Sequence, residues 1–124
     1  MDKNYNQIFA KRTRSLSVDI INHLSELPYS DKVSVIRKQI FRSSSSSASN
    51  YRAMIRARSL NERFAKICIV VEEADETLFW IEFMQDIKMY AEKTLQDWFI
   101  EAEEIVKVTA SYKKYLKEKL DSQK

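Results

Sequence analysis

The chain has 124 residues, yet it contains no glycine and only one proline, Pro28. At average usage, a chain of this length would hold about nine glycines and about six prolines. Glycine is the usual residue where the backbone turns with a positive φ angle, and tight hairpins depend on it or on Asn and Asp. Sheets rich in hairpins are therefore disfavoured, as are the glycine-rich loops that bind phosphates and dinucleotides. The composition favours a helical protein with few turns.

Apolar residues recur at helical spacing along most of the sequence, which predicts four long helices. We expect a single domain over residues 1–124. Its fold class is all-α, an antiparallel up-down-up-down four-helix bundle. The predicted helices span residues 4–26, 31–58, 60–89 and 94–120.

Residues that break or cap helices set these boundaries. Pro28 ends the first helix, because proline disfavours helical geometry in the residue before it. The start of the fourth helix is the least marked, since neither glycine nor proline lies in residues 90–93. The side chains that can cap the later helices are Ser30 or Asp31, then Ser59 with Glu62 in a capping box, and finally Thr94.

Each predicted helix carries an apolar stripe that would face the core. The first stripe is Ile8, Leu16, Ile20, Ile21, Leu24 and Leu27. The third is Leu60, Phe64, Ile67, Val71, Ala74, Leu78 and Ile81. The fourth is Leu95, Trp98, Ala102, Ile105, Thr109, Tyr112 and Leu116.

The segment 42–50, RSSSSSASN, has the composition of a disordered linker. Small and apolar residues nevertheless keep helical phase through it, and no glycine or proline accompanies the serines. Serine at a helix interface allows close approach, and its hydroxyl can donate to a carbonyl one turn earlier. We therefore predict that the run is helical, with a linker as the alternative. The stripe that continues through it is Val33, Ile36, Ile40, Ser43, Ser47, Tyr51 and Met54.

The basic residues are unevenly distributed. The net charge of the chain is +3, but residues 32–66 contain nine Lys and Arg and a single acid, Glu62. On a helix, four of these cations and two serines between them form one line, called here the basic stripe: Lys38, Arg42, Ser45, Ser49, Arg52 and Arg56. Aligned cations suit a phosphate backbone, because the release of counterions supplies affinity that does not depend on sequence.

The basic stripe has a second interpretation, in which it pairs with carboxylates of a neighbouring helix or subunit. The predicted third helix offers Glu72, Glu73, Asp75 and Glu76. No aromatic residues interleave with the cations, so recognition of single-stranded bases is not supported. The residues predicted to bind nucleic acid or a partner are Lys38, Arg42, Arg52, Arg56, Arg58 and Arg63.

Apolar residues also lie off the main stripes of the third and fourth helices, which suggests a second buried surface and hence a homo-oligomer. The predicted oligomer contacts are Trp80, Phe83, Ile87 and Phe99.

Nothing in the sequence forms an active site. His23 is the one histidine and Ile20 stands three residues before it, which excludes the Glu-x-x-His pairs of di-metal bundles. Cys68 is expected to be a small buried hydrophobic residue. We therefore expect no enzymatic activity, no catalytic residue, no metal, no cofactor and no small-molecule substrate.

The sequence also bears on localisation. The first residues are polar and lack the apolar region of a secretory signal, and no stretch is long enough to span a membrane. One cysteine cannot form an internal disulfide, which fits a reducing cytoplasm. We expect a cytoplasmic protein that does not bind membranes.

Residues 39–83, QIFRSSSSSASNYRAMIRARSLNERFAKICIVVEEADETLFWIEF, resemble the bacterial "four helix bundle protein" family. Its first members were found as reading frames in intervening sequences of large-subunit ribosomal RNA genes. The resemblance implies an antiparallel four-helix bundle that assembles into a ring-like pentamer. A related member, the accessory variability protein of diversity-generating retroelements, is a basic pentamer that binds nucleic acid and a reverse transcriptase. The present chain departs from that member in being only mildly basic overall.

Together, these observations predict a non-enzymatic oligomeric bundle that uses its basic stripe to bind RNA, DNA or a nucleic-acid-handling protein such as a reverse transcriptase. The alternative is a purely structural homo-oligomer whose basic stripe pairs with acidic residues of neighbouring subunits.

Overall fold

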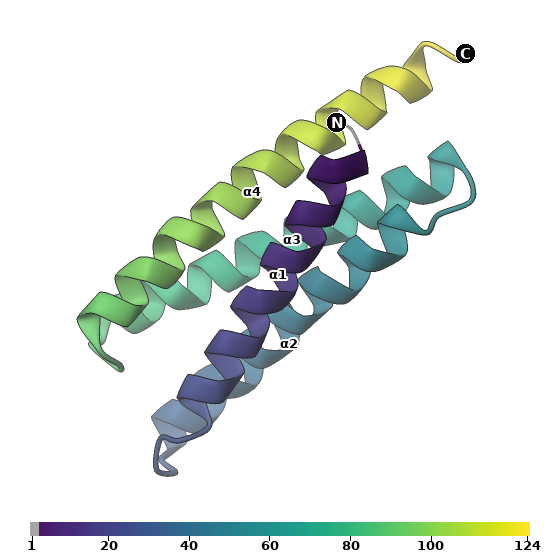
Figure 1. The fold of residues 1–124 in the computed structure, drawn as a ribbon. Coiled ribbons are helices and arrows are strands. Elements are labelled where there is room, and N and C mark those ends of the chain that lie inside the picture. The colour runs from purple at the N-terminus through teal and green to yellow at the C-terminus, as the bar shows by residue number, and fades with distance from the viewer. Residues whose placement is uncertain (1–2) are drawn as a thin grey trace.

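The computed structural model describes residues 3–124, with side chains from Tyr5 onward. Met1 and Asp2, which belong to the predicted domain and to the polar start of the chain, lie outside the described residues. The described chain folds into four helices: α1 Lys3–Leu24, α2 Asp31–Ile55, α3 Leu60–Asp86 and α4 Glu92–Asp121 (Figure 1). The predicted all-α four-helix bundle is confirmed.

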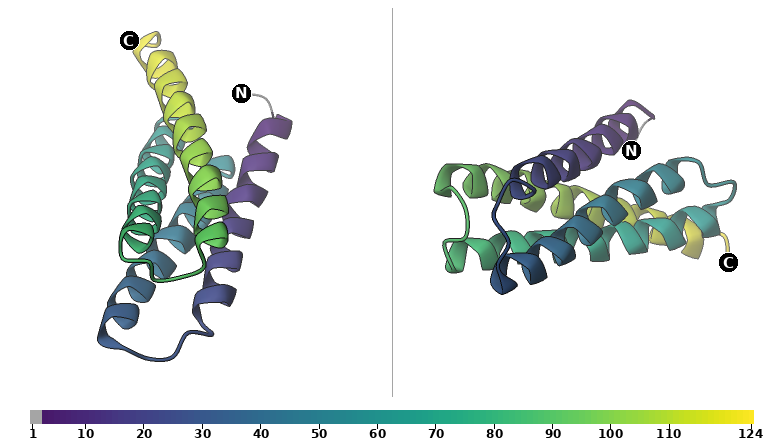
Figure 2. Two further views of the ribbon diagram at one scale, coloured as in Figure 1. Left: turned by 90° about the vertical axis from the view of Figure 1, so that its left-hand side faces the viewer. Right: turned by 90° about the horizontal axis from the view of Figure 1, so that it is seen from below.

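Consecutive helices run in opposite directions and are joined by short loops at the ends of the bundle (Figure 2). α2 packs extensively on α3 and α3 on α4, whereas α1 packs mainly on α2 and touches α4 little. Each helix therefore buries its face chiefly against its neighbour in sequence. Among residues 3–124, no helix is both long and apolar enough to cross a membrane.

Polar contacts join α1 to α4 where apolar packing between the two helices is sparse. Arg12 Nε lies 2.9 Å from Glu101 Oε2, and Arg12 Nη1 lies 3.0 Å from Glu104 Oε1. Nearer the other end of α1, Trp98 Nε1 donates a hydrogen bond of 2.7 Å to the Asp19 carboxylate. These contacts close the fourth side of the bundle.

Two of the predicted caps are present. Ser30 Oγ accepts a hydrogen bond of 3.2 Å from the backbone N–H of Val33 at the start of α2. Ser59 Oγ accepts one of 3.0 Å from the N–H of Glu62 at the start of α3. The prediction for α4 was wrong: its N-cap is Ala91, which has no side-chain hydrogen bond, and Thr94 lies inside the helix.

Three helices end earlier than predicted. α1 ends at Leu24, two residues early, and α2 ends at Ile55, because Ser59 must be extended to cap α3. α3 ends at Asp86 because Lys88 adopts a left-handed conformation with φ 52°, after which the N–H of Met89 bonds to Met84 O at 3.0 Å. This is the Schellman arrangement, in which glycine is the usual residue at the left-handed position.

The core differs from the predicted stripes in α1 and α3. Phe9 is buried in place of Ile8, which is 52% exposed. In α3, the buried face includes Val70 and Thr77, while Val71 and Leu78 are half-buried. α3 contacts helices on two sides and is apolar around much of its circumference, so the sequence pattern does not fix its orientation. The expectation for Cys68 was also wrong, because this residue is only partly buried. The α4 stripe is buried as predicted.

Candidate nucleic-acid interface

The serine run is helical throughout and lies in the middle of α2, so the linker alternative is wrong. Ser45 Oγ donates a hydrogen bond of 2.7 Å to the carbonyl of Phe41, one turn earlier. On the inner face, Ser43 accepts a hydrogen bond of 3.0 Å from Thr77 Oγ1 of α3, and Ser44 lies 2.9 Å from Ser17 Oγ of α1. Small hydroxyl side chains therefore bring α2 close to both of its neighbours.

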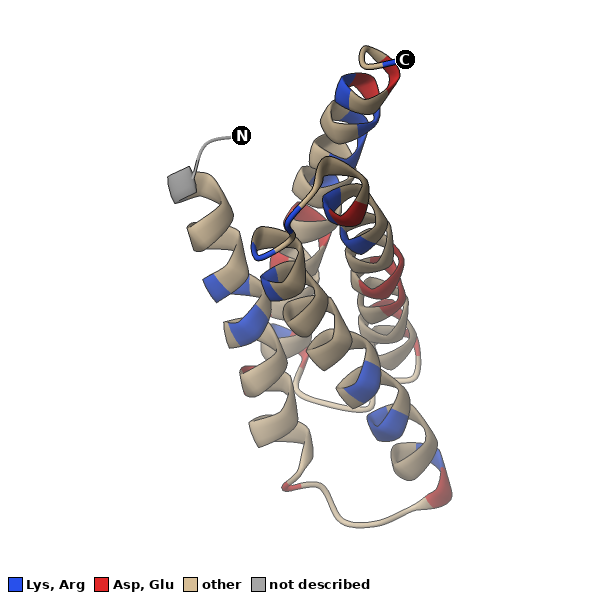
Figure 3. Ribbon diagram, turned by 90° about the vertical axis from the view of Figure 1, so that its right-hand side faces the viewer, with Lys and Arg blue, Asp and Glu red and all other residues tan. Residues whose placement is uncertain are grey.

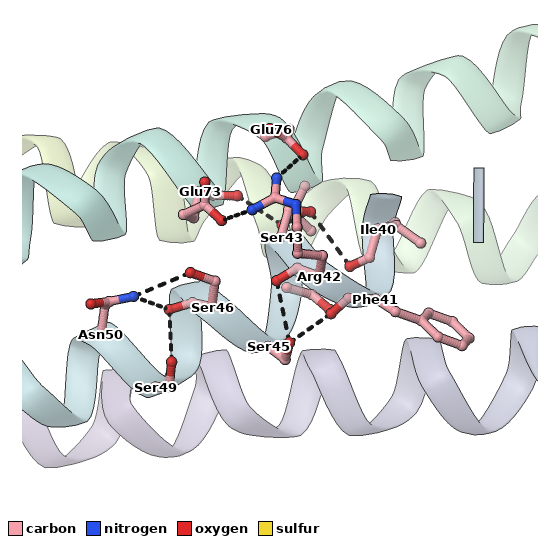
Figure 4. A network of polar contacts seen from close by, with 12 residues as sticks. Ile40, Phe41, Arg42, Ser43, Ser45, Ser46, Ser49, Asn50, Glu73 and Glu76 are labelled. Carbon is pink, nitrogen blue, oxygen red and sulfur yellow. Dashed lines mark hydrogen bonds and ion pairs between the residues drawn. The ribbon is translucent and has the colours of Figure 1, made fainter. Parts of the chain in front are cut away.

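Arg42, at the centre of the basic stripe, is paired within its own chain (Figure 4). Its Nη1 lies 2.7 Å from Glu73 Oε2, and its Nη2 contacts Glu76 Oε2. Hydrogen bonds to Glu76 and Glu73 raise the pKa of the Arg42 guanidinium. At Arg42, the second interpretation of the stripe therefore holds: carboxylates of the neighbouring helix α3, in the same chain, pair with the guanidinium. Arg42 contributes little free positive charge to a ligand.

Arg63 is also engaged in the fold. Its Nη1 donates to the Tyr112 hydroxyl at 3.2 Å, and its Nη2 donates to the carbonyl of Ile55 at 3.4 Å. The side chain is partly buried and ties the start of α3 to α4 and to the end of α2. Arg63, which was predicted to bind a nucleic acid or a partner, is therefore not a freely exposed cation of the α2 surface.

The remaining predicted cations are exposed. Lys38, Arg52, Arg56 and Arg58 project into solvent, and their side chains make no ion pair with any described residue. In Figure 3, the blue bands of Lys and Arg recur along α1 and α2, whereas the red bands of Asp and Glu gather on α3. The predicted separation of charge along the sequence is therefore a separation between faces of the bundle.

The α2 wall bearing Ser45, Ser49 and Arg52 borders a groove of about 520 Å³ between α1 and α2. The opposite wall, on α1, carries Lys11 and Arg14. The described residues that line this groove include three cations and no acid. Its other lining residues are small or apolar: Ala10, Ser17, Val18, Ile21 and Ala48.

Lys11 and Arg14 are not among the binding residues predicted from the sequence, because they lie outside the basic segment 32–66. Their spacing with Val18 repeats at three and four residues, which places all three on one face of α1. The sequence contains that signal, but only the packing of α1 on α2 shows that this face adjoins the basic stripe.

The predicted oligomer contacts have mixed exposure. Phe83 is 39% exposed, whereas Trp80, Ile87 and Phe99 are partly buried against the core. The most exposed aromatic ring of this region is Phe79, at 51%, which is not among the contacts predicted from the sequence. Phe79, Trp80 and Phe83 form a cluster in which the Trp80 centroid lies 4.9 Å from that of Phe79 and 5.5 Å from that of Phe83. This cluster is called here the aromatic patch.

His23 and the possible metal ligands were also considered as candidate functional residues in the sequence. His23 lies in the last turn of α1, where its Nδ1 is 2.8 Å from the carbonyl oxygen of Asp19 and its ring meets the ring of Trp98 edge-on. Across the part of the chain that the structure describes, no group of three or more His, Cys, Asp or Glu residues could hold a metal ion.

Comparisons with known proteins agree with this architecture. The sequence model of the 23S rRNA-intervening sequence protein family matches residues 6–111. The chain belongs to this family. It is also similar to a crystal structure of a protein with unknown function from the S23 ribosomal protein family of Bacteroides thetaiotaomicron VPI-5482. The two structures agree with a TM-score of 0.79 at 27% sequence identity, over 88% of this chain and 97% of that chain. A comparison with curated proteins finds no match.

The match to the 23S rRNA-intervening sequence protein family begins in α1 and ends in α4, so it includes the whole of α2 and α3. The resemblance inferred from residues 39–83 is thereby confirmed. In this member of the family, the stripe residues Lys38, Arg52 and Arg56 make no ion pair with any residue that the structure describes, while Arg42 and, outside the stripe, Arg63 contact other helices.

Proposed function

We propose that the chain is a non-enzymatic, cytoplasmic, homo-oligomeric protein that binds RNA through the outer face of α1 and α2. The observation that carries the proposal is a set of cations on that face that form no ion pair with an acid among residues 3–124: Lys11, Arg14, Lys38, Arg52 and Arg56. This set is called here the cationic face. Its charge is available to phosphates because the acids of α3 engage only Arg42 of the basic stripe.

The length of the cationic face suits a nucleic-acid backbone. Lys38 and Arg56 are separated by about 27 Å of helix at a rise of about 1.5 Å per residue. A nucleic-acid strand places one phosphate about every 3.4 Å of helix axis, so several phosphates can contact the face at once. Contacts to phosphate carry no sequence information, which makes this binding sequence-tolerant and strongly dependent on salt.

The RNA-binding proposal is tested by reversing the charge at Arg52 and Arg56, both exposed and without a partner that the fold needs. We expect the Arg52→Glu/Arg56→Glu variant to lose RNA affinity at low salt by at least tenfold while keeping the helicity of the wild type. The matched control, Lys107→Glu/Lys114→Glu, makes the same change in net charge on α4 and should bind RNA nearly as well. The proposal fails if the wild type shows no salt-dependent RNA binding, or if both variants bind equally.

The oligomer is proposed to form through the aromatic patch, which exposes more aromatic surface than single scattered residues would. The Nε1 of Trp80 is buried there without a hydrogen-bond acceptor among the described residues. A ring-like pentamer is the assembly that the family resemblance implies. Phe79→Ser/Phe83→Ser should lower the molar mass measured by light scattering, and Ile100→Ser, at a residue 55% exposed on α4, should leave it unchanged.

The second candidate function is a purely structural assembly in which the cationic face pairs with acids of the next subunit. It is favoured by the Arg42 contacts, which show that carboxylates of α3 can neutralise the basic stripe. Under this alternative, the Arg52→Glu/Arg56→Glu variant dissociates the oligomer in light scattering, and the wild type retains no RNA.

A further inference from the structure

A second cationic site lies at one end of the bundle, away from the groove between α1 and α2. It is a pocket of about 330 Å³ between the α2–α3 loop, the first turn of α3 and the C-terminal half of α4. These segments lie at the same end of the molecule in Figure 1. The lining residues that matter for its chemistry are Arg58, Ser59, Arg63, Tyr112, Tyr115 and Lys119.

The pocket is positively charged and has no compensating acid. Arg58, Arg63 and Lys119 line it, and no Asp or Glu is among its described lining residues. Arg58 is exposed and makes no ion pair with a described residue. The Lys119 ammonium lies over the ring of Tyr115, 5.4 Å from its centroid. Three like charges around one pocket repel one another, and an anion between them removes that repulsion.

The first turn of α3 adds to this field. The N-terminal N–H groups of a helix have no partner within the helix and carry a partial positive charge, which favours phosphate. Ser59 precedes the turn and accepts a hydrogen bond of 3.0 Å from the N–H of Glu62, so this N–H is occupied and the earlier N–H groups of the turn provide the partial positive charge. The helix terminus adds to the positive charge of Arg58, Arg63 and Lys119, and the pocket is positively charged without this addition.

The pocket also presents an aromatic surface. Tyr112 is buried, and its hydroxyl accepts a hydrogen bond of 3.2 Å from Arg63, which fixes the ring. The Tyr115 ring stacks beside it, with centroids 5.9 Å apart and planes inclined by 16°. Tyr115 is 42% exposed, so part of its ring is open to a ligand. A flat ring of this kind stacks with any base, because every base has a π-face.

We propose that this pocket binds a nucleoside 5′-phosphate, either free or at the 5′ end of an RNA strand. The phosphate lies between Arg58, Lys119 and the first turn of α3, and the base stacks on Tyr115. The volume is at the lower end of the range for small-molecule sites and fits a single nucleotide. This ligand differs from the expectation of no small-molecule substrate, because the sequence alone does not place Tyr115 beside Arg58 and Arg63.

The pocket is separate from the cationic face, which lies on α1 and α2. The proposal of nucleotide binding can therefore fail while the proposal of RNA binding holds, and the reverse is also possible. Isothermal titration calorimetry on the full chain at low salt separates them, with adenosine 5′-monophosphate, inorganic phosphate and adenosine as probes. We expect adenosine 5′-monophosphate to bind more tightly than either fragment. Lys38→Glu, on the cationic face and about 30 Å of helix away from Arg58 at about 1.5 Å per residue, should leave this binding within twofold of the wild type, even if it weakens retention of RNA.

Two exposed residues provide the decisive variants. Arg58→Ala should weaken binding of both adenosine 5′-monophosphate and phosphate at least tenfold. Tyr115→Ser should weaken only the nucleotide, by about fivefold or more. Tyr29→Ser, at a tyrosine 74% exposed near the start of α2, is the matched control and should have no effect. Circular dichroism verifies that each variant is folded.

The source of the phosphate is identified by competition. If a 5′-phosphorylated oligoribonucleotide displaces adenosine 5′-monophosphate and its 5′-hydroxyl counterpart does not, the ligand is an RNA end. If neither displaces it, the ligand is a free nucleotide. The proposal is overturned if adenosine 5′-monophosphate does not bind saturably, if adenosine binds equally well, or if Arg58→Ala has the affinity of the wild type.

Discussion

Ser17 Oγ and Ser44 Oγ lie 2.9 Å apart in the buried contact between α1 and α2. One hydroxyl donates to the other, so neither is left without a partner in this buried contact. The short side chains set the spacing of the two helices, because a larger residue at either position would have to displace the opposite backbone. The serine run is thus part of the packing of α2 against α1.

This contact predicts a difference between two substitutions of Ser44. Ser44→Val adds volume to a closely packed interface and should lower the free energy of unfolding by about 1–3 kcal/mol. Ser44→Ala keeps the close approach, loses one hydrogen bond and should cost about 1 kcal/mol. Urea denaturation measures both. Ser45→Val, at the exposed neighbour, should change stability by only about 0.5 kcal/mol. Equal losses at the two positions would show that Ser44 does not set the spacing.

A second prediction concerns Tyr51, which is buried in α2 and donates a hydrogen bond of 3.2 Å to Asn6 Oδ1. Burial raises the pKa of the Tyr51 hydroxyl, with smaller contributions from Tyr112 and Tyr5. The folded state therefore resists ionisation that the unfolded chain undergoes near pH 10, so stability must fall as the pH rises through that value.

Urea denaturation at pH 8 and at about pH 10.5 tests this dependence. The wild type should lose more stability between the two values than Tyr51→Phe, which cannot ionise. Tyr29→Phe, at an exposed tyrosine, should behave as the wild type does. If Tyr51→Phe loses as much stability as the wild type between the two pH values, groups other than Tyr51 cause the pH dependence.

The sequence predicts the helical fold well because the evidence is local. Helical phase runs through the serines, and Ser30 and Ser59 are recognisable caps whose partners lie three residues away. The orientation of α3 is less predictable. Val70 and Val71 are equally apolar, and the choice between them is made by α2 and α4, which contact α3 from two sides.

The candidate sites depend on tertiary contacts, and this limits their prediction. Helical spacing aligns Arg42 with Arg52, but it does not show that Glu73 reaches Arg42 from the next helix. Tyr115 lies far along the sequence from Arg58, and the fold alone brings the two residues to one pocket. Spacing therefore predicts which residues share a face and leaves their partners open.

A third prediction concerns the contact of Arg12 with Glu101 and Glu104. Hydrogen bonding to Arg12 lowers the pKa of the Glu104 carboxyl group, with a coulombic contribution from the same residue. A lowered folded-state pKa stabilises the protein above the unfolded pKa, and this contribution is lost as the pH falls through the folded one. The stabilising effect of Arg12 should therefore be present at neutral pH and should diminish in acid.

Comparison of the wild type with Arg12→Met tests this effect, because methionine retains much of the aliphatic volume. The variant should be less stable at pH 7, and the difference should narrow below about pH 4, where carboxyl groups become protonated. Lys93→Met removes an exposed pair with Asp97 inside α4 and should change stability little at either pH. A difference for Arg12→Met that stays constant with pH would show that Arg12 acts by packing alone.

Lys88 occupies a position where glycine is the usual residue, and the last prediction concerns its replacement by glycine. Its φ of 52° is the left-handed conformation that ends α3, and a residue with a Cβ atom is strained there by about 1–2 kcal/mol. Lys88→Gly removes that strain but gives the unfolded chain more conformational freedom, which offsets part of the gain. The net result should be an increase of about 0.5–1 kcal/mol in the free energy of unfolding, measured by urea denaturation.

The matched change Lys107→Gly, in the interior of α4, should instead lower the free energy of unfolding by about 1 kcal/mol. Destabilisation by both substitutions would mean that the lysine side chain, rather than the left-handed backbone, determines stability at the end of α3.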